Sequence, residues 1–222
     1  MHISVLLNTS MKMANLNPIK LTSDATIREL KDHVPEKSYG YLVQLIESYG
    51  ILFRISKPRV TKLGDYRYDP RSGEHVISVN SDLNTYLFLI TFIHEVAHFR
   101  QQVNNRRRTS PHGREWKQEF QTLMSPLLEE SVFPAEIADQ LAHHMDNPKA
   151  SCTDISLMRL LKIYDQKQQL ILEDLKDGDL FKLSNRQLYR RKRKLRTRYE
   201  CIEVSTDRKW FVHALAKVEI VN

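Results

Sequence analysis

The first part of the chain combines apolar residues at helical spacing with short β-rich runs. Apolar positions three or four apart predict two helices, at residues 25–34 and 39–49, and Gly50 ends the second. Three runs rich in β-branched and aromatic residues then predict strands, and a turn at residues 71–73 joins the last two as a hairpin. These runs are residues 51–55, 65–68 and 75–79.

The densest apolar stretch of the chain follows, in a segment that Asn84 can cap as a helix. That helix is predicted over residues 85–104, and the polar run that ends at Pro111 breaks it. Two further helices are expected over residues 112–130 and 134–145. Helices mixed with a few short strands in this order predict an α+β fold.

The pattern changes near residues 147–151, where a short Pro- and Ser-containing segment predicts a domain boundary. Beyond it we expect one short helix at residues 155–164 and then strands separated by turns. The strands are residues 179–183, 187–190, 198–204 and 210–221. The expected organisation is a poorly ordered lead-in (1–22), a mixed α and β domain (23–147) and a small β module (148–222).

The composition favours a folded protein of a reducing compartment. Hydrophobic residues make up 41% of the 222 positions, with only 6 Gly and 8 Pro, so a buried core is expected and wholesale disorder is excluded. Two cysteines, Cys152 and Cys201, are too few for a disulfide scaffold, which is typical of a cytoplasmic protein. The longest near-apolar run, residues 86–93, is far shorter than the roughly 20 residues that span a bilayer, so no membrane partner is expected.

The net charge of +7 is unevenly distributed along the chain. Residues 1–150 carry 18 basic and 17 acidic side chains, a net charge of +1. Residues 151–222 carry 16 and 10, a net charge of +6. The excess in the last third predicts that this part attracts a polyanion, whereas the first 150 residues contain the candidate chemistry.

The sharpest candidate site is the sequence His-Glu-Val-Ala-His, from His94 to His98, inside the long helix. Residues four apart lie one turn apart on the same helix face, so both imidazoles can bind one metal ion. Zinc binds neutral imidazole nitrogens in tetrahedral sites, and a catalytic site keeps one position open for water. Glu95 lies beside the first ligand and can act as general base toward that water. The motif therefore predicts a catalytic site with one zinc ion.

A third ligand must come from elsewhere in the chain. The metzincin pattern is excluded, because it requires Gly and His where this chain has Gln101 and Asn104. The strongest candidates are His112, which opens the next predicted helix on the same side as Trp116, and Glu119, on the flank of that apolar stripe. Geometry alone leaves both open. Weaker candidates are Glu115, Glu129, Glu130, His143 and His144.

Residues 111–117 read Pro-His-Gly-Arg-Glu-Trp-Lys. With the His94–His98 motif, this segment resembles the SprT-like zinc metallopeptidases, relatives of the eukaryotic protease Spartan. The resemblance implies that His94, His98 and His112 hold zinc and that Glu95 is the general base. It also implies a zincin-like core, in which a hairpin strand lines the substrate cleft. Because Spartan cleaves proteins crosslinked to DNA and is activated by DNA, the resemblance implies substrates of that class.

The last third departs from the family pattern. Many members end in a zinc ribbon with four cysteines, and the two that remain here, Cys152 and Cys201, cannot complete a tetrahedral structural site. We therefore expect a ribbon-like β module that lacks the full cysteine set and is held together by apolar packing. The expected core residues are Leu180, Phe181, Leu183, Tyr199, Ile202, Trp210, Phe211 and Val218.

A basic run crosses the predicted module. Residues 186–198 contain eight basic residues and no acidic one, and each phosphate that they neutralise adds salt-sensitive affinity. Tyr189 and Tyr199 flank the run as candidates for stacking on bases, and the arginines at 106–108 support the same function. The alternative is a solvated, Lys- and Arg-rich loop. The predicted nucleic-acid-binding residues are Arg190, Arg191, Lys192, Arg193, Lys194, Arg196 and Arg198.

These features predict a zinc-dependent metallopeptidase that hydrolyses peptide bonds in proteins bound or crosslinked to DNA. Its expected partners are a protein substrate and nucleic acid. The alternative is a non-catalytic nucleic-acid-binding protein with a structural zinc site. Glu95 favours the enzyme, because a structural site has no use for a base at that position. A third alternative is a zinc hydrolase that acts on a non-peptide amide.

Overall fold

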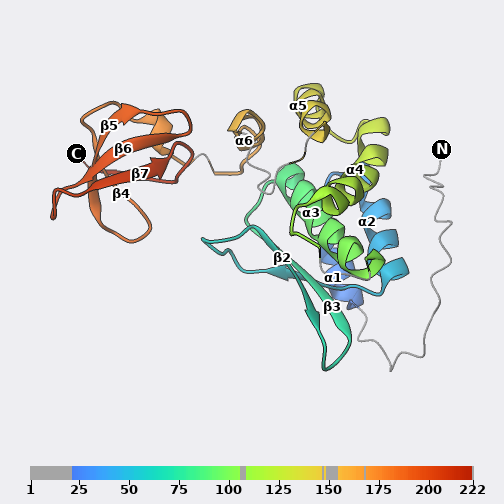
Figure 1. Cartoon of the computed structure of the whole chain (residues 1–222). Coiled ribbons are helices and arrows are strands. Elements are labelled where there is room, and N and C mark those ends of the chain that lie inside the picture. The colour runs from blue at the N-terminus through green and yellow to red at the C-terminus, as the bar shows by residue number, and fades with distance from the viewer. Residues whose placement is uncertain (1–21, 106–108, 147, 149–154, 168, 222) are drawn as a thin grey trace. The chain divides into compact units, whose positions relative to one another are not determined.

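The computed structural model describes residues 22–105, 109–146, 148, 155–167 and 169–221. Within these ranges the chain is an α+β protein with six α-helices and two small sheets, so the predicted class is confirmed (Figure 1). The chain divides into two compact units, Met1–Asp165 and Gln166–Asn222. The lead-in predicted for residues 1–22 lies outside the described residues, except for Thr22.

Capping residues mark the start of the first helix and the end of the second. Helix α1 (Asp24–Leu30) follows Ser23, whose hydroxyl accepts a hydrogen bond from the backbone N–H of Thr26. Helix α2 (Glu36–Tyr49) follows Pro35 and ends at Gly50, which takes the left-handed conformation at φ 59°. Glycine is favoured there because it has no Cβ to clash in that conformation.

A three-stranded sheet supports the helices of the first unit. It contains β1 (Leu52–Ser56), β2 (Gly64–Asp69) and β3 (Glu74–Asn80) in the order β1-β3-β2. Strand β1 is parallel to β3, and β2 forms the predicted antiparallel hairpin with β3. Phe53 of β1 and Ile77 of β3 are directly paired, and both are buried in the core. Because β3 lies between β1 and β2, β2 is an edge strand of the sheet.

The long predicted helix is the centre of the first unit (Figure 1). Helix α3 (Thr85–Asn104) begins after Asn84, whose side chain accepts a hydrogen bond from the backbone N–H of Leu87 at 2.9 Å. Its middle is buried on nearly every side, which explains why its apolar residues are not confined to one stripe. Helices α4 (Arg114–Glu129) and α5 (Ala135–Met145) follow, and α4 packs on α3.

Helix α6 (Ile155–Lys162) belongs to the first unit, which moves the division between units to a later position than the expected residue 147. Its apolar face, with Leu157 and Leu161, is fully buried in the core of that unit. The side chain of Asn84 donates to the carbonyl of Leu161 at 2.9 Å and to the carboxylate of Asp165 at 2.7 Å. An apolar helix face must be covered, so α6 stays with the helices that cover it.

The second unit contains a short helical turn, η1 (Leu172–Asp174), and one five-stranded antiparallel sheet in the order β7-β6-β5-β4-β8. Strand β8 returns to pair with β4, so the single strand expected at residues 210–221 is two strands. Cys201 is a buried free cysteine, and Cys152 lies outside the described residues. The strands are β4 (Leu180–Lys182), β5 (Leu188–Lys194), β6 (Arg198–Glu203), β7 (Lys209–His213) and β8 (Glu219–Val221).

The core of this sheet differs from the predicted one. Phe181 and Tyr199 are buried as expected, and Tyr189 joins them. Trp210 and Phe211 were expected inside but are 47% and 55% exposed. Phe211 pairs with Glu200 on the side of the sheet that faces away from the core, whereas Trp210 pairs with the buried Cys201 on the core side but lies on the edge strand β7. Across the described part of the chain, no helix combines the length and the apolar character needed to cross a membrane.

Candidate metal centre

Three histidine side chains converge at the centre of the first unit. His94 and His98 lie one turn apart on α3, and His112 lies in the loop that precedes α4. Their Nε2 atoms form a triangle, with 3.1 Å between His94 and His98, 2.9 Å between His98 and His112, and 3.1 Å between His112 and His94. Among the described residues this group can hold a metal ion.

The chemistry of this group fits a metal ion better than it fits hydrogen bonding. A neutral imidazole has one donor nitrogen and one acceptor nitrogen, so three Nε2 atoms cannot all donate to and accept from each other. Tetrahedral zinc with Zn–N bonds of about 2.0–2.1 Å separates its ligand atoms by about 3.3 Å. The observed separations of 2.9–3.1 Å are close to that value. The three nitrogens are therefore arranged as metal ligands.

The three imidazoles are held in the neutral form that binds metal. Burial, with the neighbouring histidines as a second cause, lowers the pKa of His94 to about 3. Burial also lowers the pKa of His98 to about 4, with His112 as the second cause. The pKa of His112 is lowered by burial as well. At neutral pH these side chains therefore offer lone pairs rather than charges.

The backbone conformation of a short turn brings His112 to the cluster. His112 itself has φ 58°, a left-handed conformation that is uncommon for a residue with a side chain. The next residue must be small, because a Cβ on Gly113 would lie 2.9 Å from the carbonyl oxygen of Ser110. Helix α4 begins only at Arg114, so His112 precedes the helix and does not belong to its first turn as predicted. This turn explains the pairing of His112 with Gly113.

Trp116 forms the inner wall of the cluster, a role that the sequence analysis did not assign. Its indole is completely buried, and its ring centroid lies 4.7 Å from that of His94 and 4.8 Å from that of His112. The indole Nε1–H donates to the carbonyl oxygen of His94 at 3.3 Å. Trp116 also stacks on Phe120 at 5.1 Å. The sequence feature that could have indicated this role is the spacing of four residues between His112 and Trp116.

Glu95 occupies a buried position between α3 and the edge of β2. Only 8% of the residue is exposed. The pKa of its carboxyl group is raised to about 7: burial is the largest cause, the nearby Asp65 also raises the pKa, and a hydrogen bond from the backbone N–H of Tyr66 lowers it in part. A carboxyl group whose pKa lies near neutral pH is suited to accept and release a proton.

The close packing of Glu95 depends on a glycine at the start of β2. A Cβ on Gly64 would lie 2.7 Å from Oε1 of Glu95 and 2.6 Å from the side-chain methyl carbon of Thr91. Contacts this short require the carboxylate to move. The sequence analysis missed this role, because the two residues are far apart in the chain and meet only in the folded structure.

We expect Gly64→Ala to displace the Glu95 carboxylate while leaving the three histidines in place. If the predicted hydrolytic activity depends on Glu95, its kcat should fall by about tenfold or more with the metal content unchanged, since misplacement of a catalytic group by about 1 Å can cost up to 100-fold. Steady-state cleavage and metal analysis measure the two quantities. The matched control is Gly40→Ala on α2, where no atom lies within 4 Å of an added Cβ. Equal activity of the two variants would contradict this role of Gly64.

The metal-free protein should become less stable as the pH falls below 6.5. His94 and His98 have folded-state pKa values of about 3 and about 4, against 6.5 when unfolded, so the unfolded chain binds more protons in this range. Glu95, with its pKa raised, has the opposite effect, but one carboxyl group offsets only about one of these two histidines. The free energy of unfolding should fall by ~2 kcal/mol between pH 6.5 and 4.5. Urea unfolding of the chelator-treated protein at each pH measures this free energy. A free energy of unfolding that does not change with pH would contradict the conclusion that His94 and His98 are held in the neutral form.

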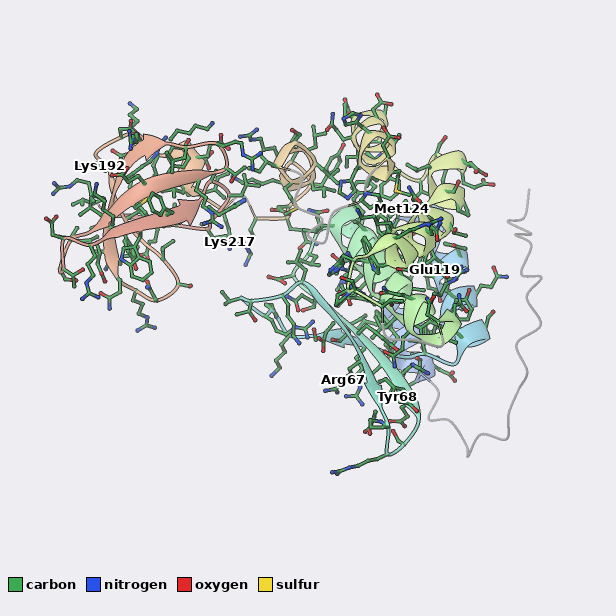
Figure 2. The ribbon with its side chains drawn as sticks, viewed as in Figure 1. Arg67, Tyr68, Glu119, Met124, Lys192 and Lys217 are labelled. Carbon is green, nitrogen blue, oxygen red and sulfur yellow. The ribbon has the colours of Figure 1, made fainter. Side chains whose placement is uncertain are left out.

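The other candidate ligands lie away from the histidine triangle or have other partners. Glu119 lies on α4 (Figure 2), where its carboxylate accepts from Arg100 at 2.7 Å and from Asn104 at 2.7 Å. His143 is exposed, whereas His144 is buried, with its ring near that of Phe120. The group of described residues that can hold a metal includes none of the candidates Glu115, Glu119, Glu129, Glu130, His143 and His144.

The structure divides the predicted nucleic-acid-binding residues into two groups. Arg191 is buried, its guanidinium lies 3.9 Å from the centre of the Tyr199 ring, and it pairs with Asp177 at 3.6 Å. Tyr189 and Tyr199 are also buried, so the prediction that they stack on bases is wrong. Side chains alternate between the two faces of a strand, so Tyr189 and Arg191 of β5 and Tyr199 of β6 point into the core. The exposed members are Arg190, Lys192, Arg193, Lys194, Arg196 and Arg198. The arginines at residues 106–108, which supported nucleic-acid contact in the sequence, lie outside the described residues.

Comparisons of this chain with protein-family models, with curated protein sequences and with solved structures found no match. The functional assignment therefore depends on the chemistry of the histidine triangle and Glu95.

Proposed function

We propose that this protein is a zinc-dependent metallopeptidase of the SprT-like type, with a zincin-like core, that acts on proteins bound or crosslinked to DNA. The observation that carries the proposal is the group of three converging histidines, His94, His98 and His112, with the buried carboxylate of Glu95 next to the first of them. Three neutral imidazoles and a nearby base are the protein components of a catalytic zinc site.

The residues of the chain have distinct roles in this proposal. His94, His98 and His112 would hold zinc, with Trp116 packed behind them. When bound, zinc supplies Lewis acidity toward the peptide carbonyl and makes water more acidic. Glu95 accepts the proton of the attacking water and passes it to the nitrogen of the leaving amine, which needs a carboxyl group with a pKa near neutral pH. Asp65 and the burial of Glu95 provide that pKa.

The edge of β2 supports a peptide substrate. The backbone N–H of Tyr66 reaches the Glu95 carboxylate, so this edge strand adjoins the proposed base. An extended peptide can add to an exposed strand edge through main-chain hydrogen bonds, independently of its sequence. The arrangement favours a polypeptide over the non-peptide amide considered above.

The runner-up function is a non-catalytic nucleic-acid-binding protein with a structural zinc site. Structural zinc sites have four protein ligands, whereas the group of described residues contains three. Burial of the Glu95 carboxylate is energetically unfavourable, and a structural zinc site would have no function for a carboxylate at that position.

Cleavage of casein by the zinc-loaded full chain tests the proposal directly. We expect cleavage that o-phenanthroline abolishes and added zinc restores, with and without single-stranded DNA in the reaction. A DNA-bound protein substrate should be included alongside casein. If neither substrate is cleaved under any of these conditions by a chain that holds one zinc ion, the peptidase assignment is wrong and the runner-up takes its place.

A further inference from the structure

Four aromatic side chains form a cluster on the hairpin whose edge was considered above for peptide binding. They are Tyr66 and Tyr68 of β2, His75 of β3 and Phe99 of α3. The centre of the His75 ring lies 4.9 Å from that of Tyr68 and 4.8 Å from that of Phe99. The Tyr66 ring lies 6.1 Å from the His75 ring and 6.1 Å from the Phe99 ring. His75 is therefore the centre of the cluster.

The inner part of the cluster is held by packing and by a hydrogen bond. Phe99 is almost completely buried, with 2% of the residue exposed. The Tyr66 hydroxyl and Nδ1 of His75 share a hydrogen bond of 2.9 Å. These contacts fix the orientation of the His75 ring. They therefore also fix the surface on which the Tyr68 ring packs.

Tyr68 is the open end of the cluster. It is 43% exposed, whereas the other three residues are buried or half-buried. Tyr68 and Tyr66 alternate with charged residues along β2 and point to the same face of the sheet. His75 pairs with Tyr68 on one side, and among the described residues no strand pairs with β2 on its other side. An added strand would therefore find the Tyr68 ring uncovered.

The position of Tyr68 along β2 relates it to the proposed base. A Cβ on Gly64 would touch the Glu95 carboxylate, and the backbone N–H of Tyr66 donates a hydrogen bond to it. A peptide bond that reaches Glu95 therefore lies beside residues 64–66. Tyr68 is two residues beyond Tyr66, roughly 7 Å at about 3.4 Å per residue. A peptide paired with this edge passes Tyr68 within about four residues of the bond to be cleaved.

We infer that Tyr68 and His75 form a subsite that selects an aromatic side chain of the peptide substrate. In a strand added to β2, the residue opposite Tyr68 places its side chain on the same face, within contact distance of the ring. An aromatic side chain there covers the exposed part of Tyr68 and extends the series of rings that begins at Phe99. A serine or a charged residue makes neither contact.

The opposite face of β2 limits this preference to one side of the bound strand. Asp65, Arg67 and Asp69 alternate with the two tyrosines, so this face of β2 carries charged side chains. The neighbours of the selected residue in the peptide would face these charges. The expected substrate is therefore an extended segment with an aromatic residue about two to four positions from the cleaved bond, followed and preceded by residues without that requirement.

This inference rests on the proposed function, because it specifies which peptides the same site selects. Cleavage and peptide binding separate the two ideas. A chain that cleaves casein with no preference for aromatic residues would overturn the subsite and leave the peptidase intact. A chain that cleaves nothing but binds aromatic peptides through Tyr68 would leave the subsite standing and end the peptidase assignment.

Mass spectrometry of casein fragments produced by the full chain tests the preference. We expect Phe, Tyr and Trp to be enriched at one position, about two to four residues from the cleaved bonds. Tyr68→Ala should remove the enrichment and raise the KM of a phenylalanine-containing peptide by about two- to fivefold, the range for a cross-strand aromatic pair. Tyr68→Phe should behave as the wild type, because the ring is kept. The control is Arg67→Ala, the exposed neighbour on β2 (Figure 2), which should keep the preference.

Peptide binding provides a readout without catalysis. Two labelled peptides, alike except for a central phenylalanine or serine, are titrated with zinc-loaded Glu95→Gln chain, and fluorescence anisotropy gives both affinities. The phenylalanine peptide should bind about two- to fivefold more tightly, and Tyr68→Ala in the same background should remove the difference. Equal affinities, or a difference that Tyr68→Ala leaves intact, would overturn the inference. Circular dichroism establishes that the variants are folded. If Tyr68→Ala does not fold, Tyr68→Leu tests the same point, since leucine fills the volume without an aromatic face.

Discussion

The variant Glu95→Gln is expected to retain one zinc ion per chain and to lose peptidase activity by about 100-fold or more. Glutamine has the same shape as glutamate but cannot accept a proton, and a positioned general base contributes about 100- to 10,000-fold to the rate. The proposed zinc ligands His94, His98 and His112 are untouched by this change. Casein cleavage and metal analysis of the same preparation measure both properties.

A matched control uses an exposed glutamate away from the site. Glu130→Gln, at the end of α4, makes the same chemical change and should leave activity and zinc content as they are in the wild type. Undiminished cleavage by Glu95→Gln would exclude Glu95 as the base. Loss of zinc by that variant would instead indicate that the carboxylate takes part in metal binding.

The variant His112→Ala should lower zinc affinity by more than about 100-fold. Removal of a residue that only supports a zinc ligand costs about 10- to 100-fold in affinity, so removal of a ligand should exceed that range. The Nε2 atom of His112 lies 2.9 Å and 3.1 Å from those of His98 and His94, which leaves two nitrogens after the substitution. Competition with a chromophoric chelator measures the affinity.

His143→Ala is the control for this experiment, because His143 is exposed on α5 and lies outside the histidine triangle. Its zinc affinity should equal that of the wild type. If His112→Ala also kept wild-type affinity, the third ligand would have to be sought elsewhere. Glu119 would then require the loss of its ion pair with Arg100 before it could bind the metal.

Most elements of the first unit were predictable, because their signals are local. The apolar spacing and the capping residue Asn84 predicted α3 with its observed bounds, and the hairpin of β2 and β3 follows from two short β-rich runs around a turn. The two motif histidines share a helix face by geometry alone. The third histidine of the group could be identified only from the folded structure, because His112 reaches His94 and His98 through a loop in which it takes a left-handed backbone conformation.

The second unit was predicted less well, because strand order and edges are not local properties. The residues of β5 alternate between core and solvent, so Arg191 is buried while Arg190 is exposed, although both belong to one basic run. Trp210 and Phe211 are both large aromatic residues in the sequence, but in the structure Phe211 points away from the core of the sheet and Trp210 lies at its edge, so both are exposed. A residue pattern cannot indicate which strand lies at an edge.

The sequence by itself determined the elements of the first unit, the motif from His94 to His98 and the excess of positive charge in the last third. These depend on residues within one helix turn or one short segment, or on composition alone. The tertiary structure decided the rest: that His112 completes the triangle, that Gly64 makes room for Glu95, and that His75 packs on Phe99. The physical reason is that these arrangements join segments far apart in the chain, and only the packing of the folded core brings such segments together.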